Sequence, residues 1–207
     1  MNEFNALERA LRGPTRECGD APPDLVQAAA AASLLDVAYA TLDSPVGTLL
    51  LATTPIGLVR IAYLDGDDQD AVLQDLAVRV SPRVLAAPRA LDEPRRELDE
   101  YFAGRRSTFE TALDWQLTGG FGRRVLQATA QIPYGSVSTY KDVAAHAGSP
   151  RGSRAAGNAL GANPLPIVVP CHRVIYSGGG LGGYTGGVGR KRVLLGVETG
   201  QGSLSVK

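Results

Sequence analysis

The sequence is poor in cysteine and histidine and has no long apolar run. Its two cysteines, Cys18 and Cys171, lie far apart, which excludes a disulfide framework and a zinc-ligand pattern. The longest early apolar run, residues 25–35, lies between aspartates and is too short to cross a bilayer. The N-terminus lacks the basic-then-apolar plan of a signal peptide. We therefore expect a cytoplasmic protein with no membrane contact and no bound metal.

The net charge is zero, but the two signs are separated along the chain. Residues 1–103 hold 9 Lys and Arg against 17 Asp and Glu, whereas residues 104–207 hold 12 against 4. A basic half suggests contact with a polyanion. Two solvated faces of opposite sign would give the same counts, so charge alone leaves both interpretations open.

The first half is typical of an α+β domain with little chemistry. Residues 1–36 look like an extension, broken by Gly-Pro and Pro-Pro turns, with an Ala-rich helix that Asp24 can cap. Apolar runs joined by short Gly and Pro turns predict an antiparallel meander of three strands. These strands are expected at residues 37–42, 48–53 and 58–64. Helices are expected at residues 68–80 and 91–102, and a short strand at residues 110–113.

The second half is typical of a mainly helical domain. After a helix at residues 120–132, two short helices flank the turn Gly148-Ser149-Pro150, a pattern that predicts a helix-turn-helix. Ser138 is the expected N-cap of the first short helix. The second is expected at residues 151–160.

The second short helix is unusual for an element that reads base edges. It opens with Arg151 and Arg154, and its middle contains small residues, among them Ala155 and Gly157. Few of these side chains could reach base edges in a major groove. We expect backbone contacts and one arginine acting alone. A small-residue helix packed tightly in a core is the alternative.

One apolar stretch leads to a cysteine with a histidine directly after it. Residues 167–169 predict a buried strand that Pro170 ends, which would place Cys171 at the end of a rigid element. A buried cysteine is as readily a small core hydrophobe. A nucleophilic thiol needs a base and an orienting acid. His172 is the candidate base, and Glu198 is the only acidic residue after Asp142.

Two other features carry weaker signals. The glycine-rich loop at residues 178–189 lacks the Lys-Ser/Thr ending of a phosphate-binding loop, but it would let backbone groups approach a flat ligand. It leads into a final helix expected at residues 190–197. His146 is interpreted as a surface histidine.

Several motifs around Cys171 occur together. They are Pro170-Cys171-His172-Arg173-Val174, Asn163-Pro164, Gly183-Tyr184-Thr185-Gly186-Gly187, Ile132-Pro133-Tyr134-Gly135, Tyr140 and Arg154. In these motifs the sequence resembles the O6-alkylguanine-DNA alkyltransferases, or methylated-DNA–protein-cysteine methyltransferases, over residues 37–198. The resemblance implies an RNase H-like α/β domain at residues 37–115, then a mainly helical, winged-helix-like alkyltransferase domain at residues 116–207. Residues 1–36 would be an extension outside the family's core.

The resemblance implies irreversible, stoichiometric transfer of an alkyl group from O6-alkylguanine, and from O4-alkylthymine, in double-stranded DNA. No cofactor is implied, and the protein would be a monomer that can cluster on DNA. Cys171 would accept the alkyl group, His172 would deprotonate it through a water, and Glu198 would hold His172. Tyr140 would protonate guanine N3 and help rotate the target phosphate. Asn163 would tie the recognition-helix side to the active-site turn.

The resemblance also implies two sets of binding residues, one for the DNA and one for the flipped purine. Arg154 would fill the gap that the flipped base leaves in the stack. The expected DNA-binding residues are Ser138, Tyr140, Arg151, Arg154, Ala155 and Gly157. The residues expected to hold the purine, together with the backbone of Cys171, are Val174, Tyr184, Thr185 and Gly186.

The chain departs from the family at three places, and other functions compete. Gly119-Gly120-Phe121-Gly122 stands where Thr-x-Phe-Gln is common, Asn158 occupies a usually small position, and Thr185 replaces a frequent Ser or Gly. A non-enzymatic DNA-damage binder is one alternative, but such proteins typically carry tryptophan in place of the cysteine. An unrelated thiol hydrolase is another, and it would regenerate Cys171 after each turnover.

Overall fold

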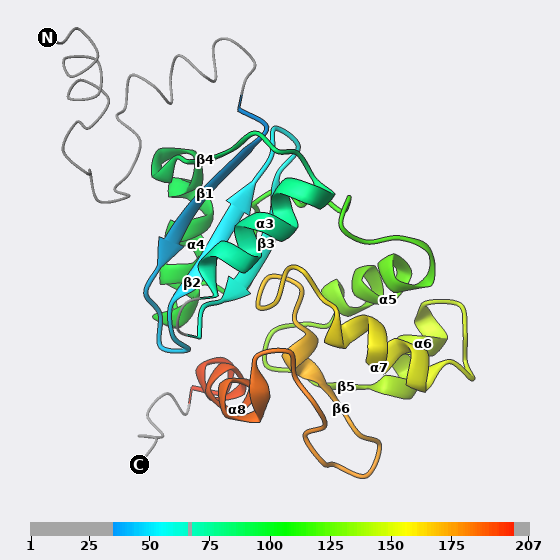
Figure 1. Ribbon diagram of the computed structural model, residues 1–207. Helices are drawn as coiled ribbons and strands as arrows, with labels where there is room; N and C mark the ends of the chain where they lie inside the picture. Colours follow the sequence, from blue (N-terminus) through cyan, green and yellow to red (C-terminus); the bar gives the residue numbers. More distant parts are fainter. Residues whose placement is uncertain (1–34, 66–67, 201–207) are drawn as a thin grey trace, which may run out of the picture.

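The computed structural model describes residues 35–65 and 68–200, which form a sheet domain followed by a helical domain (Figure 1). The expectations for the extension, including Cys18 and the helix that Asp24 would cap, concern residues outside the described ranges. The structure therefore has an N-terminal mixed sheet and a mainly helical C-terminal part, as the sequence predicted. Within the described ranges, no helix combines the length and apolarity that a membrane span requires.

The sheet has the strand order β3-β2-β1-β4. Strands β1 (Val37–Leu42), β2 (Leu49–Thr53) and β3 (Leu58–Tyr63) form antiparallel pairs, which confirms the predicted meander. Strand β4 (Val84–Ala86) pairs parallel with β1 and was not predicted. Alternate residues of β2 point to opposite faces, so that Leu49 and Leu51 enter one apolar cluster and Leu50 enters the other.

Helices cover both faces of the sheet (Figure 1). Helix α3 (Gln69–Arg79) packs its buried Leu76 in one cluster, and α4 (Asp92–Phe102) packs Leu98 and Tyr101 in the other. The helix expected from residue 91 is preceded by a 3-10 turn, η1 (Pro88–Leu91).

The prediction of a strand at residues 110–113 is wrong. Leu113 makes one isolated bridge to Leu58, and no ladder follows it. The physical reason is that the buried Glu97 carboxylate accepts the backbone N–H groups of Glu110 and Thr111, at 3.0 and 3.1 Å. These donors are therefore not available to a neighbouring strand.

The helical domain is built from α5 (Gly120–Ala130), α6 (Tyr140–His146), α7 (Ser153–Gly161) and α8 (Gly187–Glu198). Helices α5, α6 and α7 contact one another, and the turn between α6 and α7 confirms the predicted helix-turn-helix. A two-stranded parallel pair, β5 (Ser138–Thr139) with β6 (Val174–Ile175), joins the start of α6 to the cysteine segment.

Three expected helix starts shift in this domain, and one of them is that of α8, which begins at Gly187 and not at Arg190. Ser138 lies in β5, and Thr139 is the N-cap of α6, where its Oγ1 accepts from the backbone N–H of Asp142 at 3.2 Å. The prediction of Ser138 as the cap is wrong because α6 begins at Tyr140, so Thr139 directly precedes the helix and Ser138 lies one residue too early. Arg151 precedes α7, which begins at Ser153.

The stretch before the cysteine is a buried turn, so the strand predicted at residues 167–169 is also wrong. Pro166 and Val169 form an isolated bridge across it, and Ile167 is the one non-glycine residue with positive φ (75°) in the described part of the chain. Proline donates no hydrogen bond to a ladder, which disfavours a strand here. The segment is nevertheless fully buried at Ile167 and Val169, so Cys171 does follow a rigid element.

Candidate active site

Cys171 opens a short 3-10 turn, η2 (Cys171–Arg173), and is 4% exposed. Asn163 fixes this turn from the far side, because its Nδ2 donates to Val169 O at 3.0 Å and to Cys171 Sγ at 3.2 Å. Its Oδ1 accepts from the backbone N–H of Leu165. One buried amide therefore ties the segment after α7 to the cysteine.

The Cys171 thiol is protonated in the resting protein. Burial raises its pKa to about 11, although the Asn163 hydrogen bond and the charge of Lys191 both act to lower it. A thiol in this state is a weak nucleophile. It needs a neighbouring base before it can attack.

His172 has the properties of that base. Its side chain is fully buried, and its Nε2 donates to Glu198 Oε1 at 2.7 Å. Its Nδ1 has no hydrogen-bond partner among the described residues. A carboxylate at Nε2 assigns the proton to that nitrogen and leaves a lone pair on Nδ1. Burial lowers the pKa of His172, while Glu198 acts to raise it, so the imidazole is neutral at pH 7.

Glu198 stays ionised at the end of α8. Its carboxylate accepts from Arg173 Nε and Nη2, each at 2.9 Å, and from the backbone N–H of Gly135 at 3.1 Å. Burial acts to raise the pKa of Glu198, but hydrogen bonds from His172 and Arg173 outweigh it and lower the pKa to about 2. A buried carboxylate with several donors is a fixed negative charge beside the imidazole.

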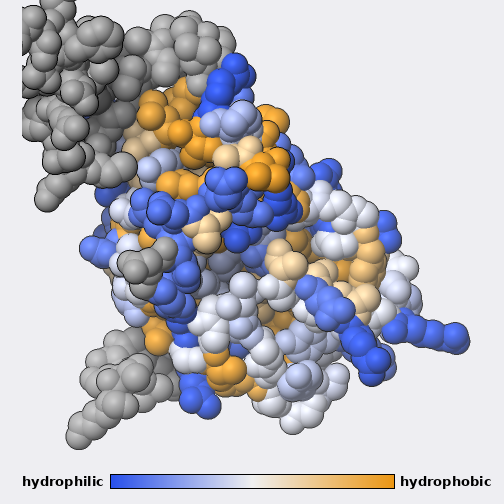
Figure 2. Space-filling model, viewed as in Figure 1, coloured by the Kyte–Doolittle hydropathy of each residue, from blue (hydrophilic) through white to orange (hydrophobic). Residues whose placement is uncertain are grey.

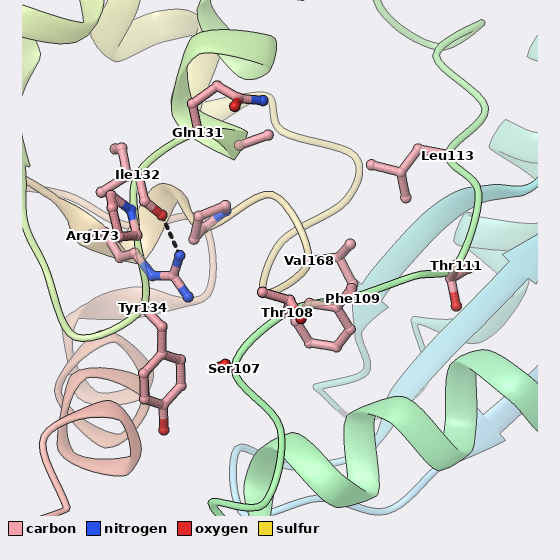
Figure 3. Close-up of a pocket in the computed structure, with 13 residues that line it drawn as sticks. Ser107, Thr108, Phe109, Thr111, Leu113, Gln131, Ile132, Tyr134, Val168 and Arg173 are labelled. Atoms are coloured by element: carbon pink, nitrogen blue, oxygen red, sulfur yellow. Dashed lines mark hydrogen bonds between the residues drawn. The ribbon is translucent and has the colours of Figure 1, made fainter.

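Arg173 is itself held by a further hydrogen bond, to a backbone carbonyl. Its Nη1 donates to Ile132 O at 2.5 Å, the bond that is dashed in Figure 3. This arginine lines a cavity of about 330 Å³ between the segment after α4, which carries Phe109, and the helical domain (Figure 3). Cys171 is not among the residues that line this cavity.

A different cavity, of about 280 Å³, opens onto Cys171. Its wall contains Tyr140, Gly157, Tyr184 and Thr185 from the predicted site. The other lining residues are Leu160, Gly161 and Gly183. Val174 and Gly186 were expected to hold the purine, but neither is among the residues that line this cavity.

Tyr140 and Tyr184 are both held by hydrogen bonds. Tyr140 begins α6, and its hydroxyl donates to Gly183 O at 3.4 Å. The Tyr184 hydroxyl lies 2.6 Å from that of Tyr63, on β3 of the sheet domain. Thr185 Oγ1 donates to the last carbonyls of α7, at 3.1 and 3.2 Å. The wall of the cavity therefore belongs to the helical domain, and Tyr63 of the sheet domain supports it through Tyr184.

A shallower hollow adjoins the cysteine cavity and shares Tyr140, Gly157 and Gly183 with it. Its lining also includes Arg154 and Asn158, whereas Arg151 is exposed just before α7. Ala155 is exposed and Ser138 is half-buried. Figure 2 shows strongly hydrophilic side chains projecting from the helical domain. His146 is exposed on α6, apart from this site, as interpreted from the sequence.

Three residues of the site were missed by sequence reasoning. Arg173 lies in the cysteine motif but was given no role. Lys191 is fully buried, and its Nζ donates to Val174 O at 2.6 Å and to Leu181 O in the glycine-rich loop. Tyr101 reaches Glu198 from α4. Nothing in the sequence near Lys191 or Tyr101 distinguishes them from surface and core residues of ordinary helices.

Comparison with known proteins covers both domains. The family model described as the ribonuclease-like domain of 6-O-methylguanine DNA methyltransferase matches residues 37–115, and the model of its DNA-binding domain matches residues 120–200. The methylated-DNA–protein-cysteine methyltransferase of Mycobacterium tuberculosis H37Rv is 39% identical over 160 residues, which is 77% of this chain and 91% of the relative. The constitutive enzyme of that name from Bacillus subtilis is 38% identical over 77% of this chain and 94% of its own length.

Solved structures agree with the sequence matches. The crystal structure of Mycobacterium tuberculosis OGT in complex with DNA superposes with a TM-score of 0.69 at 38% identity, covering 81% of this chain and 96% of that one. The O6-methylguanine-DNA methyltransferase of Pyrococcus kodakaraensis gives a TM-score of 0.58 at 26% identity. The chain therefore belongs to the methylated-DNA–protein-cysteine methyltransferase family.

Proposed function

We propose that this protein repairs DNA by direct reversal, with Cys171 Sγ taking the alkyl group from O6 of guanine, or from O4 of thymine, in double-stranded DNA. The observation that carries the proposal is a buried cysteine on a cavity wall, followed by a histidine that a glutamate orients. The names of its relatives and the DNA-bound structure of one of them support the same reaction.

The proton moves first. His172 Nδ1 accepts the thiol proton of Cys171 through one water, and the resulting imidazolium is stabilised by Glu198 at Nε2. The thiolate then attacks the alkyl carbon in line, the C–O bond breaks, and its electron pair passes to the guanine. Tyr140 donates a proton to guanine N3 as this charge develops. Burial raises the pKa of Tyr140, which keeps its hydroxyl protonated until then.

The target base must leave the duplex, because Cys171 is too deeply buried to reach a stacked base. Arg154, which is exposed on α7, would fill the gap in the stack. Small residues such as Ala155 and Gly157 let this helix approach a minor groove closely. Val174, Thr185 and Gly186 would contribute backbone groups around the purine.

The C–S bond that forms is a stable thioether, so each chain acts once. We further propose that the protein works in the cytoplasm as a monomer that clusters on DNA, without a cofactor. In this proposal residues 37–115 and 116–207 are its two domains. Retention of Cys171 disfavours a non-enzymatic damage binder, and a thiol hydrolase would require turnover.

The nucleophile is tested by the substitution Cys171→Ala. Transfer of the alkyl group from a duplex with O6-methylguanine should be abolished, whereas binding to that duplex should persist, because the DNA-facing residues of α7 are untouched. Transfer can be measured with a radiolabelled methyl group, and binding by fluorescence anisotropy. The matched control, Cys18→Ala, should keep full transfer. Retained transfer in Cys171→Ala would refute the assignment.

A further inference from the structure

One hydroxyl from the sheet domain reaches the histidine–glutamate pair of the helical domain. Tyr101, on α4, is fully buried, and its hydroxyl donates to Glu198 Oε1 at 2.9 Å. The Tyr101 hydroxyl oxygen also lies 3.4 Å from His172 Nε2. The other hydrogen-bond donors to Glu198 among the described residues, His172, Arg173 and Gly135, all belong to the helical domain.

We propose that Tyr101 is a positioning residue for alkyl transfer, which orients Glu198 and, through it, the imidazole of His172 whose Nδ1 accepts the thiol proton. This inference rests on the proposed roles of His172 and Glu198. It gives the ribonuclease-like domain a part in the chemical step, in addition to its part in the fold.

The tautomer follows from what surrounds Nε2. The Tyr101 proton is directed to Glu198, so the phenol oxygen turns a lone pair toward His172 Nε2. Both oxygens near that nitrogen are then acceptors, which favours a proton on Nε2 and excludes it from Nδ1. The phenol keeps its own proton, because burial and the charge of Glu198 raise the pKa of Tyr101 far above its ordinary value.

Packing fixes where this hydroxyl lies. The Tyr101 ring contacts three other aromatic rings, with centroid distances of 5.4 Å to Phe102, 5.4 Å to Phe109 and 6.1 Å to Tyr134. Phe109 belongs to the segment after α4, and Tyr134 to the helical domain. A phenylalanine at position 101 would keep these contacts and remove one oxygen atom.

The substitution Tyr101→Phe should therefore change chemistry more than stability. Removing a donor to a charged group should slow transfer about tenfold or more. With one donor fewer, Glu198 pairs more strongly with the imidazolium, so the pKa of His172 rises. The acid limb of the pH–rate profile should then move to higher pH. The groups that face His172 and share in this profile are Cys171, Arg173, Tyr184, Lys191 and Glu198.

The matched control is Tyr134→Phe. The Tyr134 hydroxyl belongs to the same aromatic cluster but donates to Val197 O at 3.1 Å, so its loss removes no hydrogen bond to His172 or Glu198. Rate and pH profile should equal those of the wild type. A ¹⁵N spectrum of the imidazoles adds a direct measure, since the chain has two histidines, His146 and His172. The His172 signal should report protonation at Nε2 in both proteins and a higher pKa of the imidazole in Tyr101→Phe.

Alkylation of Cys171 is measured in the same assay for all three proteins. A Tyr101→Phe variant that matches the wild type in rate overturns the inference. So does a slower variant whose pH profile and His172 pKa are unchanged, because that result assigns Tyr101 to the fold alone. A wild type that leaves Cys171 unmodified overturns the proposed function itself, and the inference with it.

Discussion

At the scale of single residues, burial decides where the protons of the site lie. It raises the pKa of the Cys171 thiol to about 11 and lowers that of His172, so both groups are neutral at pH 7. Glu198 is charged, because the hydrogen bonds from His172 and Arg173 outweigh the effect of its burial. The thiolate therefore exists in quantity only while His172 holds the proton.

The rate of alkyl transfer should follow the protonation of His172. Because its folded pKa lies below the ordinary value of about 6.5, the rate should stay level from pH 8 to about pH 6.5 and fall only at lower pH. Rapid-quench measurement of the alkylated Cys171 peptide across this range checks it. A rate that already declines from pH 8 to pH 7 would contradict this account of the base, in which His172 acts with a lowered pKa.

The sequence predicted those residues of the site that adjoin Cys171 or that belong to a residue type scarce in the second half of the chain. His172 adjoins Cys171, and Glu198 stood out because acidic residues are scarce in the second half of the chain. Lys191 and Tyr101 act through contacts that only the fold creates. Tyr101 is 97 residues from Glu198 in sequence, and no periodicity links them.

At the scale of elements, the segments that carry the site are short and are shaped by side-chain to backbone bonds. Asn163 bonds both ends of the turn before Cys171, and Thr139 caps α6. Periodicity in the sequence predicted the longer helices and the meander well. It could not predict these segments, because a single amide or hydroxyl decides their conformation.

The glycine-rich loop positions Tyr140, and the substitution Gly182→Ala tests this. Gly182 has φ of 72°, and an added Cβ would lie 2.8 Å from the Tyr140 hydroxyl. Both the strain, about 1–2 kcal/mol, and the displaced Tyr140 ring should slow transfer. Single-turnover rates on methylated duplex, with melting temperatures, measure the two effects.

The matched control for that substitution is Gly178→Ala, in the same loop. An added Cβ there meets nothing within 4 Å, and its backbone φ is not positive. Its rate and melting temperature should equal those of the wild type. Equal rates for Gly182→Ala and Gly178→Ala would show that the loop does not position Tyr140 for the reaction.

At the scale of the whole molecule, the two domains differ in charge but share contacts at the site. The basic second half carries α7, the helix that we propose faces DNA, while the acidic first half supplies the sheet. Two tyrosines of the sheet domain nevertheless reach the site, Tyr101 at Glu198 and Tyr63 at Tyr184. The sequence predicted the division into two parts, but not these two contacts between them.

Duplex binding should weaken as salt rises, because binding releases counterions from the phosphates. Arg151→Ala, in the turn before α7, should reduce the slope of log K against log salt by about one. Arg89→Ala removes an exposed arginine from the sheet domain and should leave the slope unchanged. Fluorescence anisotropy titrations at several salt concentrations provide the slopes. Equal slopes for the two variants would contradict the placement of the DNA on the helical domain.

In the proposed reaction one sulfur, that of Cys171, is alkylated once and stays alkylated. The most direct test is intact-protein mass spectrometry after incubation with excess duplex DNA containing O6-methylguanine, followed by peptide mapping. We expect the gain of a single methyl group per chain, located on Cys171, with one guanine restored for each protein molecule. Unmodified protein after many guanines have been restored, or a methyl group on another residue, would contradict it.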